Sequence, residues 1–255
     1  MNLGIIGCGA IGTDVGLAAD KMKEIKKIYL FDINEKASHK LNKRLSKSEI
    51  KSVSEFLDFV DVVFEAASQQ AVEQYSEEVI NAGKDLVIMS VGSLLNEKFK
   101  KKLEKIAREK KCKIYLPSGA VCGIDGILSA SADQINEVTL VTTKPPVSLG
   151  REINKREILY EGSARGAVKN YPMNLNVAAS LSLAGIGFDN TKVEIIADPV
   201  ATRINHKILA HGKFGRLRAE VENMPNPNNP KSSYMASLSA IATLKKIVDP
   251  IQIGA

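Results

Sequence analysis

The sequence predicts an α/β fold in two parts: a parallel sheet covered by helices, followed by an α+β region with a mainly antiparallel sheet. Two observations predict this fold. Short apolar runs alternate with helical patterns in the first half, and strands with one charged face follow in the second. The pattern changes near Pro117. We therefore expect domains at 1–117 and 118–231, and a C-terminal helix within 232–255 that packs back on the first domain.

The first half contains five short runs that are rich in Ile and Val and apolar at consecutive positions. Such runs are typical of strands buried on both faces of a sheet. The expected strands are Leu3–Ile6, Ile28–Phe31, Asp61–Glu65, Leu86–Ser90 and Lys113–Leu116. Helical patterns separate them at Gly12–Lys23, Glu35–Leu45, Ala71–Ala82 and Glu97–Lys110. Regular alternation of strands and helices implies that the strands pair in parallel.

In the second half, residues at every second position share the same character. This period is typical of antiparallel strands with one exposed face. The expected strands are Glu137–Thr143, Lys192–Asp198, Ile204–Ala210 and Arg216–Glu222, with a buried helix at Asn174–Leu183. The Pro- and Asn-rich segment Met224–Lys231 is expected to be a loop before a final helix at Ser232–Ile247.

Composition and charge exclude several classes of protein. The chain has 255 residues, of which 44% are hydrophobic and 25% charged, with no apolar run long enough to cross a membrane and no secretory signal. We expect a soluble, cytoplasmic protein. The net charge of +6 comes from lysines mixed with acids on a solvated helix face, so no nucleic-acid partner is expected. Cys8, Cys112 and Cys122 lack metal-ligand spacing, so no metal site is expected.

A glycine-rich turn follows the first expected strand and opens the first expected helix. Its sequence is Gly7-Cys8-Gly9-Ala10-Ile11-Gly12, the G-x-G-x-x-G pattern that holds a dinucleotide pyrophosphate at a helix N-terminus. Asp32 ends the second expected strand about 20 residues later, where a carboxylate can bind the ribose 2′-hydroxyl. The sequence therefore predicts a Rossmann-type domain that binds NAD, with NADP as the alternative.

The ends of further strands are expected to line the same crevice. Ligands of open parallel sheets bind at the carboxyl ends of the strands. The residues at these ends are small or polar: Ala66, Ala67, Ser68, Ser90 and Val91. The alternative is that they are ordinary loop residues.

Among the three histidines, His206 is the candidate acid/base. His39 lies in a charged helical pattern, and His211 lies in the turn-like segment His211–Gly215. In the expected strand Ile204–Ala210, His206 shares a face with Ile204 and Ile208. One interpretation is a core histidine; the other is a partly buried imidazole that titrates near neutrality and transfers protons.

Seven segments, in this order, resemble the L-aspartate dehydrogenases of the NadX type over nearly the whole chain. They are GIIGCGAIG at the start, FEAAS at 64–68, VIMSVGSL at 87–94, PSGAVCGIDGI at 117–127, YPMNLNVAASLSLAG at 171–185, ADPVATRINHKI at 197–208 and NPKSSYMASLSA at 229–240. The resemblance implies a Rossmann domain followed by an α+β domain that carries the catalytic residue and mediates formation of a homodimer. It assigns the active-site histidine to His206, and cofactor contacts to Ala120 and Asn176.

The resemblance also implies the reaction: oxidative deamination of L-aspartate to oxaloacetate and ammonia, through iminosuccinate, with NAD(P) as hydride acceptor. Such an enzyme often supplies NAD biosynthesis. The dicarboxylate needs cationic partners, for which the candidates are Arg165, Lys169, Arg203 and Lys231. The alternatives are a related two-domain reductase, similar to dihydrodipicolinate reductase or to sugar oxidoreductases, and a non-catalytic NAD-binding sensor.

Overall fold

The computed structural model describes residues 1–150, 152–171 and 176–254, apart from the side chains of Pro230 and Lys231. The chain divides into two compact units. The first comprises Met1–Pro117 and Ser237–Gln252, and the second comprises Ser118–Ala236 with a short stretch from Ile253 onward. Among the described residues, no helix combines the length and the apolar character that crossing a membrane requires.

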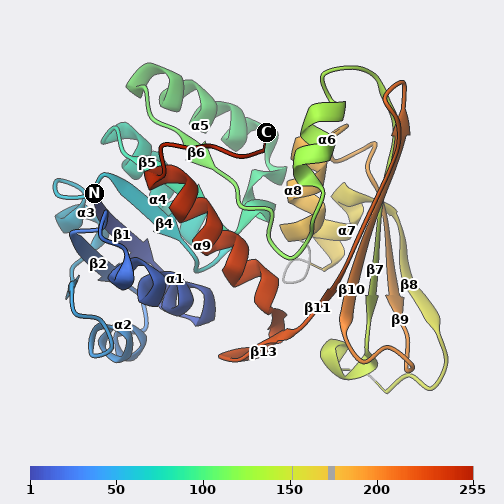
Figure 1. The fold of residues 1–255 in the computed structure, drawn as a ribbon, viewed down its shortest axis with the longest axis horizontal. Helices are drawn as coiled ribbons and strands as arrows, with labels where there is room; N and C mark the ends of the chain where they lie inside the picture. Colours follow the sequence, from blue (N-terminus) through green and yellow to red (C-terminus); the bar gives the residue numbers. More distant parts are fainter. Residues whose placement is uncertain (151, 172–175, 255) are drawn as a thin grey trace. The chain divides into compact units, whose positions relative to one another are not determined.

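The first unit is built on a six-stranded sheet in the order β3-β2-β1-β4-β5-β6, in which all neighbours are parallel (Figure 1). Its strands are β1 (Asn2–Ile6), β2 (Lys27–Phe31), β3 (Ser48–Ile50), β4 (Val62–Glu65), β5 (Asp85–Ile88) and β6 (Ile114–Tyr115). The expected parallel sheet is therefore confirmed. From β1 the chain adds β2 and β3 on one side and then β4, β5 and β6 on the other. The strand order therefore reverses between β1 and β4, and ligands of such sheets bind at this switch point.

Helices cover both faces of this sheet. Figure 1 shows α1 (Ala10–Lys21) and α9 (Tyr234–Val248) over one face, and α4 (Gln69–Asn81) and α5 (Glu97–Lys110) over the other. Side chains of β1, α1 and α9 share one buried core cluster, which includes Leu3, Ile5, Val15, Ala19, Ala240 and Leu244. The C-terminal helix thus completes the apolar core of the first unit.

Local signals explain why some elements were predicted and others missed. α5 has the predicted bounds, because the Asn96 side chain caps its start by accepting from the backbone N–H of Phe99. α2 (Glu35–Asn42) begins where expected and ends three residues early. β3 and the four-residue α3 (Val53–Phe56) were not predicted, because elements this short carry too little periodicity.

The second unit is built on a five-stranded sheet in the order β11-β10-β7-β9-β8. Its strands are β7 (Ile135–Lys144), β8 (Glu157–Ser163), β9 (Lys192–Ala197), β10 (Ile204–Gly212) and β11 (Gly215–Asn223). The mainly antiparallel character is confirmed, although β7 and β9 pair in parallel. The parallel pairing of β7 with β9 is possible because β8 and two helices separate them along the chain and allow a crossover.

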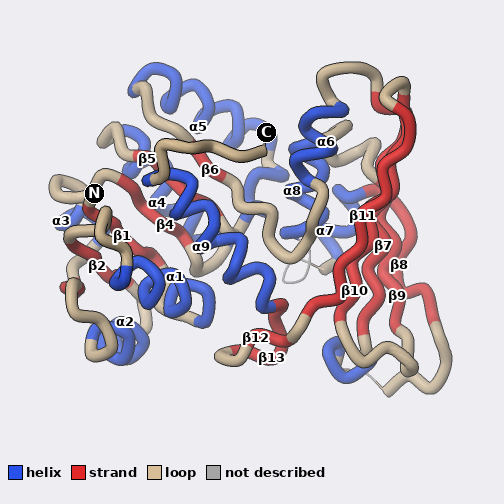
Figure 2. Tube along the Cα trace, viewed as in Figure 1, coloured by secondary structure: helices blue, strands red, loops and turns tan. Residues whose placement is uncertain are grey.

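The helices of the second unit lie on one face of its sheet. They are α6 (Ile124–Ala130), α7 (Ala164–Asn170) and α8 (Asn176–Ala184), and Figure 2 shows them together on the same side of the strands. The helix expected at 174–183 corresponds to α8, and its first two expected residues lie outside the described part of the chain. Among the described residues of this unit, no α-helix lies on the opposite face of the sheet.

The loop expected at Met224–Lys231 is partly wrong. The segment forms a small hairpin of β12 (Pro225–Asn226) and β13 (Asn229–Ser233). The Asn226 side chain holds the turn, because its Oδ1 accepts from the backbone N–H groups of Asn228 at 2.7 Å and Asn229 at 3.2 Å. Asn and Pro favour turns, but pairing of the flanking residues depends on contacts that composition does not show.

Candidate active site

The glycine turn has the geometry that the sequence predicts for it. Gly7 has a φ of +96°, and a Cβ there would lie 2.7 Å from the backbone of Ala66. A Cβ on Gly12 would collide with the carbonyl oxygen of Gly7. The Gly7 N–H donates to the carbonyl of Phe31 at 2.8 Å and ties the turn to the end of β2. Both glycines are therefore required by close backbone packing.

The middle of the turn is open. A Cβ built on Gly9 meets no described atom within 4 Å, and α1 begins at Ala10 without a side-chain cap. The N-terminus of the helix therefore begins next to open space at Gly9. This arrangement fits the pyrophosphate of a dinucleotide, which accepts from helix N-terminal N–H groups.

Asp32 lies next to this turn, at the carboxyl end of β2. Its Oδ2 accepts from the backbone N–H of Cys8 at 2.7 Å, and its Oδ1 accepts from Asn34 at 2.8 Å. It lines a cavity of about 230 Å³ in the first unit together with Gly7, Phe31, Ala67, Ser68 and Tyr75. A carboxylate oriented in this way can still accept from a ribose hydroxyl, because each oxygen has a second lone pair. The cavity is thus suited to a nucleoside.

Cys8 and Ser68 have structural roles at the same edge. Cys8 is buried, and its burial together with the charge of Asp32 raises the pKa of its thiol to about 12, which disfavours the nucleophilic thiolate. The Ser68 hydroxyl caps α4 by accepting from the backbone N–H of Ala71. Ala66 packs against the core cluster of the first unit, and Val91 is buried in the short helix η1 (Val91–Leu95).

A buried carboxylate, Glu65, connects the ends of β4 and β5, and the sequence analysis did not select it. Its oxygens accept from the backbone N–H of Ala67 at 2.8 Å, the backbone N–H of Ser90 at 3.0 Å and the Ser90 hydroxyl at 2.8 Å. Burial raises the pKa of Glu65, and the hydrogen bonds from Ser90 and Ala67 oppose that rise. The signal that could have found it is an acid that ends the otherwise apolar run Val62–Phe64.

His206 lies on the helix-covered face of the sheet in the second unit. It is 4% exposed and pairs across the strands with Val221 on β11 and Thr142 on β7. Its Nδ1 lies 2.9 Å from the Thr142 hydroxyl. Burial, reinforced by the charge of Lys144, lowers the pKa of His206 to about 3. The interpretation in which this imidazole titrates near neutrality is therefore wrong, because the side chain is more completely buried than expected for a strand with one exposed face.

Lys144 lies on the same sheet as His206, and it was not predicted as a site residue. It is the last residue of β7, two positions after Thr142 on the same face, and it is 5% exposed. Burial lowers the pKa of its ammonium to about 8. The signal was present in the alternation of β7, which places Val138, Leu140, Thr142 and then Lys144 on the buried face.

Ala120 and Asn176 lie in the second unit. The carbonyl oxygen of Ala120 accepts from the side-chain amide of Asn223 at 3.1 Å. Asn176 is half-buried and begins α8, directly after the undescribed residues 172–175. Asn223 itself is buried, and its Oδ1 has no hydrogen-bond partner among the described residues. Leaving such an acceptor unpaired costs about 1–3 kcal/mol.

Of the four basic residues proposed for the substrate, Arg165 and Lys169 lie on α7, and Arg203 directly precedes β10. Arg165 on α7 forms a two-point ion pair with Asp189, at 2.5 and 2.9 Å, and lies over the ring of Phe188. Lys169 is exposed on the same helix. Arg203 lines a cavity at the start of β10, and the side chain of Lys231 lies outside the described part of the chain. Arg203 is the member of the set that lies beside His206 in sequence and lines a cavity.

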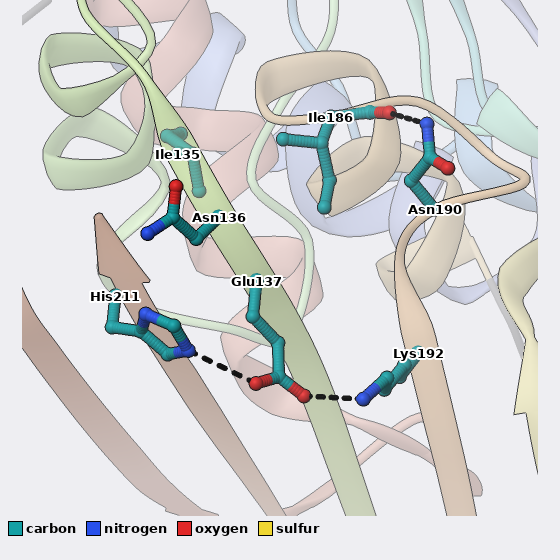
Figure 3. A pocket seen from close by; sticks show the side chains of 7 residues that line it. All are labelled: Ile135, Asn136, Glu137, Ile186, Asn190, Lys192 and His211. Carbon is teal, nitrogen blue, oxygen red and sulfur yellow. Dashed lines mark hydrogen bonds and ion pairs between the residues drawn. The ribbon is translucent and has the colours of Figure 1, made fainter. Parts of the chain in front are cut away.

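The remaining histidines lie elsewhere. His39 is exposed on α2, as expected. His211 was expected in a turn, but it belongs to β10. Because an odd number of positions separates it from His206 along the strand, its side chain lies on the opposite face of the sheet. Figure 3 shows Glu137 between His211 and Lys192: its carboxylate is 3.0 Å from His211 Nε2 and 2.5 Å from Lys192 Nζ. These residues line a separate cavity of about 390 Å³.

Together, these features define a two-domain protein with a dinucleotide-binding Rossmann domain and an α+β domain that buries an imidazole. A family model described as "Homoserine dehydrogenase, NAD binding domain" matches residues 7–117, and one described as "Aspartate dehydrogenase, C-terminal" matches residues 125–247. L-aspartate dehydrogenases from Methanosarcina barkeri and Methanothermobacter thermautotrophicus are 47% and 40% identical to this chain. The matches cover 100% of the chain and 99% and 98% of those proteins. The chain belongs to the L-aspartate dehydrogenase family.

Solved structures agree with this assignment. The crystal structure of aspartate dehydrogenase from Thermotoga maritima has a TM-score of 0.81 at 28% identity and covers 100% of this chain and 99% of that one. Scyllo-inositol dehydrogenase from Lactobacillus casei has a TM-score of 0.61 at 13% identity and covers 100% of this chain and 90% of that one. That second likeness is one of fold alone, so the sugar-oxidoreductase alternative gains no functional support from it.

Proposed function

We propose that this chain oxidises L-aspartate to oxaloacetate and ammonia, through iminosuccinate, with NAD as the hydride acceptor and NADP as the alternative. The observation that carries the proposal is the 47% identity to an L-aspartate dehydrogenase over the whole chain. A non-catalytic NAD-binding sensor would not need the buried His206–Thr142 pair or a buried ammonium on the same face. The residues of the second unit therefore also support an enzyme.

The first unit would hold the cofactor through its glycine turn and Asp32. When bound, the pyridine nucleotide supplies a hydride acceptor. The open N-terminus of α1 would bind the pyrophosphate, and the cavity beside Asp32 would take the adenosine ribose. A carboxylate at this position repels a 2′-phosphate, which is why we favour NAD over NADP. Ala67, Ser68, Ser90 and Val91 are proposed to line the site, with Ala120 and Asn176 contacting the cofactor.

His206 would transfer protons during hydrolysis of the imine. Because its pKa is lowered to about 3, the imidazole is neutral and has a lone pair available. Thr142 would orient the ring through Nδ1. The opposite nitrogen, Nε2, would take a proton from the water that attacks the imine carbon, and the proton would then pass to the leaving nitrogen. The hydroxyl of the resulting carbinolamine would then give its own proton to that nitrogen, so that carbon–nitrogen cleavage releases ammonia and leaves the carbonyl of oxaloacetate.

We further propose that the chain forms a homodimer through the second sheet. In the described part of that unit, the face opposite α6, α7 and α8 carries no α-helix (Figure 2). It mixes half-buried apolar side chains, such as Val141 and Leu209, with the charged pair Lys207–Glu220. Such a mixed face fits a homodimer interface, where apolar area and polar pairs occur together.

A cytoplasmic role in supplying iminosuccinate for NAD biosynthesis is part of the same proposal. Its support is limited to the reaction and to the three cysteines, Cys8, Cys112 and Cys122, which are all unpaired. Unpaired cysteines are typical of a reducing compartment. Isotope-labelled aspartate followed into the nicotinamide ring of cells that express the enzyme would test the metabolic role.

The experiment that tests the reaction is formation of NADH with each proteinogenic amino acid at alkaline pH. We expect L-aspartate to give the highest kcat/KM, with ammonia and oxaloacetate formed in equal amounts. Activity with another amino acid and none with L-aspartate would overturn the proposal. Repeating the assay with NADP measures the cofactor preference directly.

A further inference from the structure

Asn223 ends an apolar stripe on β11. Leu217, Ala219 and Val221 precede it at alternate positions on the helix-covered face, while the intervening residues are charged. Asn223 is 3% exposed, so its amide is held in the interior of the second unit. A polar side chain at the buried end of an apolar stripe requires partners for both its donor and its acceptor.

The orientation of this amide is fixed by its one hydrogen bond. The Asn223 Nδ2 donates to the carbonyl oxygen of Ala120 at 3.1 Å. A carbonyl oxygen can only accept, so the opposite rotamer would place two acceptors against each other. Oδ1 must therefore point away from Ala120, and no described residue donates to this buried oxygen.

A cavity lies beside this acceptor. Asn223 lines a volume of about 260 Å³ with Arg203, Ile204, Ser232 and Ser233, all of them in the second unit. A buried acceptor, a guanidinium and two hydroxyls are complementary to a ligand with both N–H donors and a carboxylate. The size suits a small metabolite, because cavities for larger organic ligands start at about 300 Å³.

Two residues that line the cavity are close in strand register to the candidate catalytic imidazole. Ile204 and Asn223 are directly paired in the β10–β11 register, and His206 and Val221 form the next pair on the same face. The orphan acceptor and the imidazole are thus on neighbouring strands, two residues apart along the register. A ligand that contacts Ile204 and Asn223 would therefore be next to the residue pair that contains His206.

We propose that Asn223 recognises the amino group of an α-amino dicarboxylate through Oδ1, while Arg203 binds one carboxylate of the same molecule. This inference rests on the proposed function and names a specificity-determining residue for it. Because the buried Oδ1 has no partner among the described residues, an N–H donor that reaches it would distinguish the amino acid from the corresponding dicarboxylic acid. Arg203 has a long contact of 3.9 Å with Glu222 and is half exposed, so it can turn to a substrate carboxylate.

The test compares L-aspartate with succinate, which has two carboxylates and no amino group. In Asn223→Leu, we expect KM for L-aspartate to rise about 10- to 100-fold, the loss expected for one hydrogen bond to a charged group. Competitive inhibition by succinate and the Kd for NADH should stay within about twofold, since neither uses Oδ1. Asn205→Leu, on the outward face of β10, is the matched control and should leave all three values unchanged.

Each other outcome has a definite meaning. An unchanged KM, or equal weakening of L-aspartate and succinate, would overturn the inference, because the amide would then act only by holding Ala120. A change in NADH affinity alone would assign Oδ1 to the cofactor and would also overturn it. If Asn223→Leu does not fold, Asn223→Ser is measured, which removes Oδ1 and keeps a hydroxyl. If the wild type is inactive with L-aspartate, the proposed function fails, and the same comparison is made with the amino acid that is oxidised and its deamino analogue.

Discussion

The Nδ1 atom of His206 lies 2.9 Å from the hydroxyl of Thr142, the residue directly opposite it on β7. The partner is a neutral hydroxyl, which offers no negative charge to stabilise an imidazolium. Burial and the nearby ammonium of Lys144 both disfavour the charged ring. The relationship therefore produces an oriented imidazole that stays neutral at ordinary pH.

The first prediction concerns His206 itself. His206→Ala should lower kcat about 10²- to 10⁴-fold, the usual contribution of a general acid or base, while the Kd for NADH is unchanged. His211→Ala is the matched control, because His211 lies on the same strand but on the opposite face. Steady-state kinetics and NADH fluorescence titration measure the two quantities. Full activity in His206→Ala would remove the residue from the mechanism.

The second prediction is a pH dependence of stability in two windows. His206 has a lowered pKa, so the unfolded chain binds more protons than the folded one between pH 3 and 6.5, and stability falls on acidification through that range. Lys144 acts likewise between pH 8 and 10.5, where stability should rise with pH. Urea unfolding at a series of pH values measures both slopes.

The variant Lys144→Met distinguishes the contribution of Lys144 to the pH dependence of stability from that of His206. The difference between a pKa of about 8 and the ordinary value of 10.5 corresponds to roughly 3 kcal/mol of destabilisation by the buried ammonium at neutral pH. Lys144→Met should therefore raise the free energy of unfolding at neutral pH and abolish the rise above pH 8. The slope below pH 6.5, which belongs to His206, should persist. Loss of both slopes together would contradict the assignment.

The third prediction separates two glycines of the same turn. Gly9→Ala meets no described atom in the free protein, so its free energy of unfolding should be unchanged, while NADH binding weakens because the methyl group occupies the pyrophosphate position. Gly12→Ala should instead destabilise the fold, because its Cβ would collide with the Gly7 carbonyl. Thermal unfolding and NADH titration distinguish the two effects. Equal loss of stability in both variants would argue against an open helix N-terminus.

The fourth prediction concerns Asp32 and cofactor choice. Asp32→Ser removes the carboxylate that accepts hydrogen bonds from the backbone N–H groups of Cys8 and Asn34. The ratio of kcat/KM for NAD to that for NADP should fall, because a 2′-phosphate would no longer meet a negative charge. Glu35→Ser, on the exposed first turn of α2, is a control for nearby charge. An unchanged ratio in Asp32→Ser would remove Asp32 from the ribose site.

Much of the first unit could be predicted because its signals are local. Buried parallel strands are apolar at consecutive positions, and the glycine pattern of residues 7–12 reflects steric demands that hold wherever a strand turns sharply into a helix. Elements of a few residues, such as β3, could not be predicted because they are too short to show a period.

The chemistry of the second unit was less accessible from the sequence. The alternation of residue types correctly placed His206 on the same face as Ile208, but it did not reveal how completely the His206 side chain is buried. The pKa of His206 depends first on burial and then on the charge of Lys144, which is more than 60 positions away and lies near the ring only because β7 pairs with β10. Lys144 and Asn223 were missed because each lies one residue beyond the end of its expected strand, at Thr143 and Glu222.

The sequence by itself determined the two-part α/β architecture and the glycine turn, because steric demands of glycine and hydrophobic periodicity act over a few residues, whereas His206 was predicted from the family resemblance. Only the tertiary structure decided the parallel β7–β9 pairing, the neutral state of His206, the buried ammonium of Lys144 and the unpaired oxygen of Asn223. These features arise from desolvation and from partners on distant strands. Burial of a charge or an acceptor is a property of the assembled sheet.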